Sequence, residues 1–212
     1  GNNTTLSGTL SVTGNSIFSG SLEVTGATTL NNTLSVTGNT TLSGSINIAS
    51  GSGFYRAGNK LFNYGQFCNT YTQSGSADTA YPMHFNTTDM GDGVNITNNG
   101  SGLPTRITVE NTGIYNIQFS AQLGTIANET VDFSIWLERT GSIVSNSNGQ
   151  ITITKTAGGG NTLAAWNYLV QLNAGEYAEL YYSKTTANGQ IQYLASQGTP
   201  TRPATPWRAL RL

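Results

Sequence analysis

Residues 113–123 read GIYNIQFSAQL, in which apolar and polar side chains alternate. Because successive side chains along a strand point to opposite faces, this segment predicts a β-strand with one buried face. The buried face would carry Tyr115, Ile117, Phe119, Ala121 and Leu123, and the other face Asn116, Gln118, Ser120 and Gln122.

Similar alternation recurs on both sides of this strand. The apolar members of the further runs are Ile107 and Val109; Phe133, Ile135 and Leu137; Ile151 and Ile153; Trp166, Tyr168, Val170 and Leu172; and Ala178, Leu180 and Tyr182. Turn-forming sequences at 111–113, 140–141, 158–160, 173–175 and 188–189 separate these runs. Short strands at this spacing predict an all-β sandwich or jelly roll, although residues 74–104 fit no strand cleanly.

A twelve-residue repeat forms the first quarter of the chain. Residues 3–50 divide without gaps into NTTLSGTLSVTG, NSIFSGSLEVTG, ATTLNNTLSVTG and NTTLSGSINIAS. Three positions of each block are apolar, namely Leu6, Phe18, Leu30 and Leu42; Leu10, Leu22, Leu34 and Ile46; and Val12, Val24, Val36 and Ile48. All have even numbers, so an extended chain places them on one face, with Ile17 as the exception. Each block is predicted to form two short strands, with turns at its glycines or at Asn32.

A single copy of this repeat cannot bury its apolar rows or pair its backbone groups. Several copies wound about a common axis, with the apolar rows inward, would provide both. A flexible Gly/Ser/Thr linker and a single-chain solenoid are the alternatives, and the fixed parity of the apolar positions argues against the linker.

The repeat resembles the β-helical stalks of phage and other viral fibres, which are parallel homotrimers. The resemblance covers about residues 3–50, and low-complexity Thr/Gly repeats also occur in bacterial surface proteins. It implies three parts: a trimeric β-helical stalk at 1–50, a neck at 51–61 where GSGFYRAGNK breaks the register, and a head at 62–212.

The head resembles the C1q/TNF-like jelly roll. The family pattern matches at 113–115 (Gly-Ile-Tyr), at 172–176 (Leu-Asn-Ala-Gly-Glu) and in the final strand at 207–212, where Trp-Arg-Ala-Leu replaces the usual aromatic-Gly-Phe ending. The resemblance implies a homotrimer whose first and last head strands lie side by side. It also sorts the loops by direction. Those expected to point away from the stalk are 74–104, 124–130, 156–161 and 185–204, and those expected to point towards it are 111–113, 140–148 and 173–175.

Composition argues against several classes of function. Only 9% of the residues are charged and the net charge is -1, which offers no electrostatic surface for nucleic acid. No apolar run approaches the roughly 20 residues of a membrane span, so we expect no membrane insertion. The chain begins inside a running repeat, which favours an upstream region that binds other virion proteins.

Catalysis, cofactor binding and metal binding find little support in the residues present. His84 and Cys68 are the only residues of their kinds, which removes most nucleophile–base pairs and metal sites. Asp89 and Asp92 have a spacing that suggests a calcium loop, but two carboxylates supply too few oxygens for one. We therefore expect no enzyme activity, no cofactor and no metal, with calcium near Asp89 and Asp92 left open.

These features predict a structural virion fibre, tail or capsid, exposed on the extracellular virion surface. Its homotrimeric head would attach to a host-surface glycan or protein receptor. The alternatives are a head that acts only as a trimerisation cap, and a bacterial or spore-surface C1q-like adhesin. The candidate binding residues on the expected distal loops are Asn128, Glu129, Lys155, Asn161, Asn188, Gln190 and Arg202. For each of them a solvated loop that binds nothing is the simpler alternative.

Overall fold

The structure is a computed structural model of the 212-residue chain. It describes residues 5–49, 52–56, 58–155, 160–196, 198, 203–204 and 207–211, without the side chains of residues 59 and 207–211. All regular secondary structure within these ranges is β-strand, and they hold no helix that could span a membrane. The chain divides into two compact units, Gly1–Asn47 and Ile48–Leu212.

The described part of the second unit contains fifteen strands. Their bounds are β1 Tyr55–Arg56, β2 Asn59–Lys60, β3 Tyr64–Asn69, β4 Tyr81–Pro82, β5 Thr87–Asp92, β6 Val94–Asn98, β7 Pro104–Val109, β8 Gly113–Thr125, β9 Thr130–Arg139, β10 Ser142–Ile143, β11 Gly149–Thr154, β12 Asn161–Leu172, β13 Tyr177–Lys184, β14 Gly189–Ile191 and β15 Trp207–Arg211.

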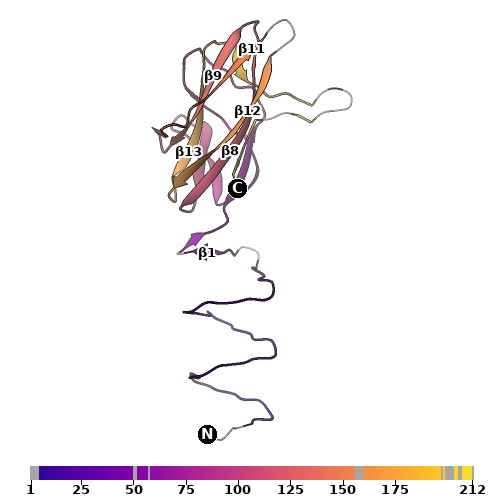
Figure 1. Ribbon diagram of the computed structural model, residues 1–212, viewed down its shortest axis with the longest axis vertical. Coiled ribbons are helices and arrows are strands. Elements are labelled where there is room, and N and C mark those ends of the chain that lie inside the picture. The colour runs from indigo at the N-terminus through magenta and orange to yellow at the C-terminus, as the bar shows by residue number, and fades with distance from the viewer. Residues whose placement is uncertain are drawn as a thin grey trace. The chain divides into compact units, whose positions relative to one another are not determined.

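Two sheets pack face to face in this unit (Figure 1). The first has the order β12-β8-β15-β3-β5, with β14 beside β8; the second has the order β10-β9-β13-β7-β6, with β11 on β9 and β4 on β13. Eight strands form the body of the sandwich, namely β3, β7, β8, β9, β11, β12, β13 and β15. When these are numbered 1 to 8 along the chain, the sheets run 6-3-8-1 and 5-4-7-2, which is the double Greek-key order of a jelly roll. The first and last of these strands, β3 and β15, pair antiparallel as expected.

The hydrophobic core between the sheets follows the alternation predicted from the sequence. The five apolar side chains of β8 expected to face inward are all at most 4% exposed. Most inward positions of the neighbouring strands are also buried, namely Ile107, Val109, Phe133, Ile135, Leu137, Ile153, Val170, Leu172, Ala178, Leu180 and Tyr182. The three others, Ile151, Trp166 and Tyr168, are half-buried and pack against the same core. The prediction of a half-buried sandwich is therefore confirmed for these strands.

The segment 74–104 departs from the prediction. It was expected to be a long distal loop without strands, and instead it contains β4, β5 and β6. The strands β5 and β6 lie at the edges of their sheets and are largely exposed, and β4 has only two residues. Because an exposed edge strand needs no apolar face, these segments lack the alternation that marks the other strands.

In the repeat unit, no residue between 5 and 49 is assigned to a strand, so the strands predicted for each block are absent from the single chain. Bends occur at 7–8, 13–14, 19–20, 25–26, 31–32, 37–38 and 43–44. They coincide with the predicted turns at glycines and at Asn32. The segments between the bends have no neighbouring backbone in one chain, which is why no ladder of hydrogen bonds forms there.

Candidate functional site

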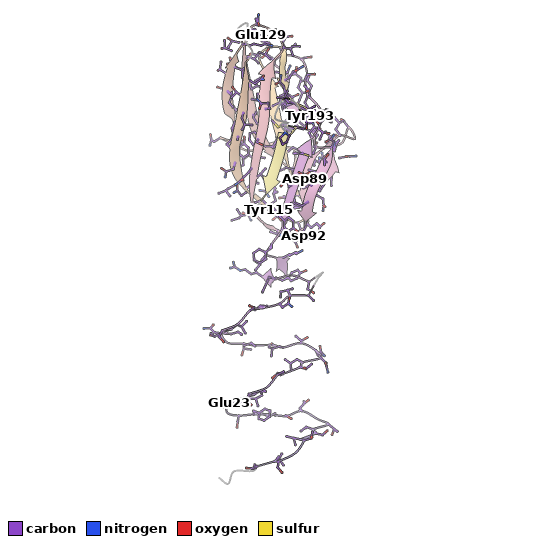
Figure 2. The ribbon with its side chains drawn as sticks, turned by 90° about the vertical axis from the view of Figure 1, so that its right-hand side faces the viewer. Glu23, Asp89, Asp92, Tyr115, Glu129 and Tyr193 are labelled. Carbon is purple, nitrogen blue, oxygen red and sulfur yellow. The ribbon has the colours of Figure 1, made fainter. Side chains whose placement is uncertain are left out.

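The sandwich has two ends, which are marked by labelled residues in Figure 2. Tyr115 and Asp92 lie near one end, called basal here, and Glu129 lies at the opposite, apical end. Strand register agrees, because Thr130 pairs with Thr154 and Gly189 pairs with Thr125. Loops 126–129 and 185–188 therefore meet at the apical end. Leu172, before the turn at 173–176, pairs with Gly113 close to Tyr115. Arg139, before the turn at 140–141, pairs with Ala178, which closely follows the turn at 173–176. Both turns therefore lie at the basal end.

A group of polar side chains, called the apical cluster, fixes the loops at the apical end. It consists of Thr125, Glu129, Lys155, Lys184 and Thr186. The carboxylate oxygen Oε1 of Glu129 accepts hydrogen bonds from Thr186 Oγ1 at 2.7 Å and from Thr125 Oγ1 at 3.2 Å. The bond from Thr186 is the largest of the effects that lower the pKa of Glu129. Lys155 Nζ donates to the carbonyl oxygen of Thr125 at 3.1 Å.

Lys184, the last residue of β13, anchors this cluster to the sheet. Its side chain is 1% exposed, and its ammonium group donates to the carbonyl oxygens of Gly75 at 2.5 Å, Ala187 at 2.9 Å and Thr186 at 3.1 Å. Burial lowers the pKa of this ammonium group. The hydroxyl of the neighbouring Tyr182 donates to the carbonyl of Ser74 at 3.2 Å. Two loops far apart in sequence, 74–75 and 186–187, are thereby held against the end of β13.

The structure places the predicted binding residues as follows. Asn128 and Asn161 are exposed, and Glu129, Lys155, Asn188 and Gln190 are half-buried. Arg202 lies outside the described residues. Glu129 and Lys155 lie together at the apical end, and their charged groups bond to neighbouring parts of the chain.

Sequence reasoning missed Lys184, although a signal for it exists. Ala178, Leu180 and Tyr182 are the inward positions of β13, and Lys184 continues their parity at the end of the strand. A lysine on the inward side of a strand end predicts an ammonium group that is satisfied by backbone carbonyls.

The aspartates considered for calcium lie on β5 and have protein partners. Lys60 Nζ donates to Asp92 at 2.5 Å, and Gln66 Nε2 donates to Asp89 at 2.7 Å. Within the described ranges, no three His, Cys, Asp or Glu side chains are grouped so that they could hold a metal ion. His84 is half-buried, with Nδ1 2.9 Å from the hydroxyl of Tyr71, and burial lowers its pKa.

The two outer faces of the sandwich differ in chemistry. Strands β8 and β12 contain no charged residue, and Ile114, Leu163 and Leu169 are 73%, 59% and 72% exposed on that side. The outer face of the second sheet is polar and aromatic. There Arg106 lies 4.1 Å from the ring centre of Tyr177. The part of the first sheet formed by β8 and β12 is therefore uncharged and exposes aliphatic side chains, whereas the outer face of the second sheet combines polar and aromatic side chains.

Comparison with known proteins gives structural matches only. No family model matches the sequence, and no curated protein does. Two solved structures share 70% of the chain: the globular domain of zebrafish complement 1qA protein and the Eiger TNF from S. frugiperda. The match to the complement domain covers 93% of that protein's chain, with 10% sequence identity and a TM-score of 0.37. The match to the TNF protein covers 90% of its chain, with 12% sequence identity and a TM-score of 0.42. The jelly-roll assignment rests on the strand order of the head itself.

Proposed function

We propose that this chain is the subunit of a homotrimeric fibre on the surface of a virus particle, and that its head attaches the particle to a host surface. The observation that carries the proposal is the exposure of the repeat. Of its twelve in-phase apolar side chains, eleven are 52–68% exposed in the single chain, and only Ile48 is less exposed. Rows of large apolar side chains at a fixed spacing favour burial against identical copies.

The geometry of the repeat supports a regular assembly. The second apolar position of the first three blocks is 67%, 66% and 68% exposed, at Leu10, Leu22 and Leu34. The third position is 52% exposed in each of the same blocks. Equal exposure in the first three blocks, together with bends six residues apart, is what one repeated conformation would give, so one contact made with a neighbouring copy could recur along these blocks. The likeness of this repeat to viral fibre stalks is the reason for choosing a virion as its location.

The uncharged face of β8 and β12 supports association of the heads. The centres of protein interfaces are depleted of charged residues, and this face combines three exposed aliphatic side chains with amides such as Asn116 and Asn167. Three heads joined through it would leave the second sheet and the apical end accessible to a receptor. Several weak contacts then act together through avidity.

Two measurements test this function. Sedimentation should give three times the 22.3 kDa mass of one chain. The purified chain should also bind envelope fractions of the host and compete with whole particles for adsorption. A stable monomer contradicts the fibre, and a trimer that binds no host fraction contradicts attachment.

A second function is favoured by the apical cluster, whose charged groups are occupied with internal bonds. In that alternative the head only caps and registers the trimer. Changes to exposed apical residues such as Asn128 would then leave adsorption unchanged, whereas attachment through the apical end predicts that they weaken it.

A further inference from the structure

Two adjoining hollows lie on the outer face of the second sheet. One hollow of about 360 Å³ is walled by Trp136, Val144 and Asn148, and a second of about 430 Å³ by Asp132 and Gln150. Ser134 and Ser183 line both hollows, so the two lie side by side. We call them together the sheet groove. Each hollow has a volume in the range of sites that bind small molecules.

An aromatic platform forms part of the wall. Trp136 on β9 and Tyr181 on β13 are cross-strand partners, with ring centres 5.8 Å apart and planes inclined by 21°. Trp136 also lines the first hollow, so the stacked pair lies at the edge of the groove. A flat apolar surface held beside polar groups is suited to the C–H face of a sugar ring.

Hydrogen bonds between strands hold the polar groups of the groove in place. Thr152 Oγ1 donates to Asp132 Oδ1 at 2.6 Å, and Gln150 Nε2 donates to Ser134 Oγ at 3.3 Å. The backbone N–H of Asp132 donates to Thr185 Oγ1, and the backbone N–H of Thr185 donates to the carbonyl oxygen of Asp132. A carboxylate accepts several hydrogen bonds and an amide both donates and accepts. Asp132 and Gln150 therefore present fixed acceptors and a donor to sugar hydroxyls at little further entropic cost.

The charges of the groove select among sugars. Asp78 and Asp132 are the acidic groups of its lining, and Lys184 is the one cation of that lining as described. The ammonium group of Lys184 is buried and points to three backbone carbonyls, so it is not available to a ligand. Carboxylates without an accessible cation repel anionic sugars such as sialic acids and sulfated saccharides.

The geometry points to the sheet groove as a binding site for a neutral oligosaccharide, with one ring on Trp136 and hydroxyls bonded by Asp132 and Gln150. This inference rests on the attachment function proposed above, since it names the class of receptor. The groove lies on the sheet opposite the uncharged face, so a trimer would present three copies of it.

The test uses the intact chain and soluble, monovalent probes, which exclude avidity. Maltotetraose, cellotetraose, mannotetraose and the N-acetylglucosamine tetramer are titrated by calorimetry, beside sialyllactose and a sulfated disaccharide. The structure predicts binding of at least one neutral probe and of neither acidic one. Asp132→Asn should weaken that binding on the order of 10-fold and Gln150→Ala roughly 3- to 10-fold. The control Asn95→Ala, an exposed site on the same sheet outside the groove, should leave it unchanged.

Trp136→Ala should abolish binding. This change also removes the stacking with Tyr181 and can therefore unfold the head. If it does, the exposed polar variants Asp132→Asn and Gln150→Ala decide the result. Binding of the acidic probes alone, or neutral binding that neither polar variant weakens, overturns the groove as the site. Absence of all probe binding while the chain still adsorbs to host envelope fractions overturns the groove and leaves attachment standing. Loss of adsorption as well overturns both.

Discussion

The ammonium nitrogen of Lys184 lies 2.5 Å from the carbonyl oxygen of Gly75, which is 109 positions earlier in the chain. This contact joins the loop before β4 to the end of β13, and the same ammonium group holds two further carbonyls of loop 185–188. The shape of the apical end therefore depends on one buried charge.

Replacing that charge should destabilise the head. Lys184→Met keeps much of the side-chain volume but leaves three carbonyls without their donor. Each charge-assisted bond contributes about 1.5–3 kcal/mol, and relief of the buried charge offsets part of the loss, so we expect a net decrease of about 2–4 kcal/mol in the free energy of unfolding. Urea denaturation measures it. Lys155→Met removes one bond from a half-buried lysine, and water can take the place of that bond, so it should cost less than about 1 kcal/mol. Equal effects of the two changes would refute the special role of Lys184.

Alkaline pH should reveal the buried tyrosine beside it. Burial raises the pKa of Tyr182 from 10 to about 12. A phenol with a raised folded pKa contributes stability that is complete below pH 10 and is lost as the pH rises to 12, which amounts to at most about 2.7 kcal/mol. The wild type should therefore lose more stability than Tyr182→Phe between pH 10 and 12. The lowered pKa of Lys184 has the opposite effect, since it makes the free energy of unfolding rise with pH up to 10.5. Both proteins contain Lys184, so the difference between their stability curves isolates Tyr182. Parallel curves would show that Tyr182 does not titrate in this window.

Acid should loosen the apical cluster through Glu129. Its pKa is lowered chiefly by the hydrogen bond from Thr186, so its contribution is present above its ordinary value of 4.5 and is lost as the pH falls through the folded value. Melting temperatures measured from pH 7 to pH 3 should fall further for the wild type than for Glu129→Gln. Glu23→Gln, an exposed change in the repeat unit, is the control and should follow the wild type.

Much of the head could be predicted because its central strands are buried on one face only. Tyr115, Phe133 and Leu180 must all lie on the side of the strand that excludes water. This requirement appears in the sequence as alternation of apolar and polar residues. The edge strands β5 and β6 escaped prediction since little of either is buried. The turns of the repeat were predictable from their glycines, whereas the strands predicted between them are absent from the single chain.

The candidate sites were less predictable than the fold. Counting strands predicts that Glu129 and Lys155 lie at the same end of the sandwich, but sequence does not say which of their bonds are internal. The sheet groove combines residues of β9, β11 and β13, and nothing in their local sequence marks them as a group. Side chains on a polar outer face carry no parity signal beyond pointing outward, so only the strand order brings Trp136 beside Tyr181 and Gln150 beside Ser134.

The uncharged face of the head should be required for the trimer. Ile114→Glu and Leu169→Glu place carboxylates where both side chains are more than 70% exposed in the single chain, so the fold of each head should survive. In a trimer the same carboxylates would be buried without a partner. We expect sedimentation to show weakened association of the heads. If the repeat alone holds the chains together, the measurement is made on chains from which the repeat has been removed. Ser142→Glu, at an exposed strand position of the other sheet, should remain as associated as the wild type.

The repeat offers the sharpest comparison, because neighbouring positions in it are predicted to lie on opposite faces. Leu22 belongs to an apolar row and Ser21 precedes it on the opposite face. If three copies bury the rows along a common axis, Leu22→Asp brings three carboxylates together in a dry interior and should lower the melting temperature of the trimer or dissociate it. Ser21→Asp places the same charge in water and should have little effect. Scanning calorimetry with sedimentation on both variants distinguishes the models: equal tolerance of the two changes would mean that the rows face solvent, and the repeat would then be a linker instead of a stalk.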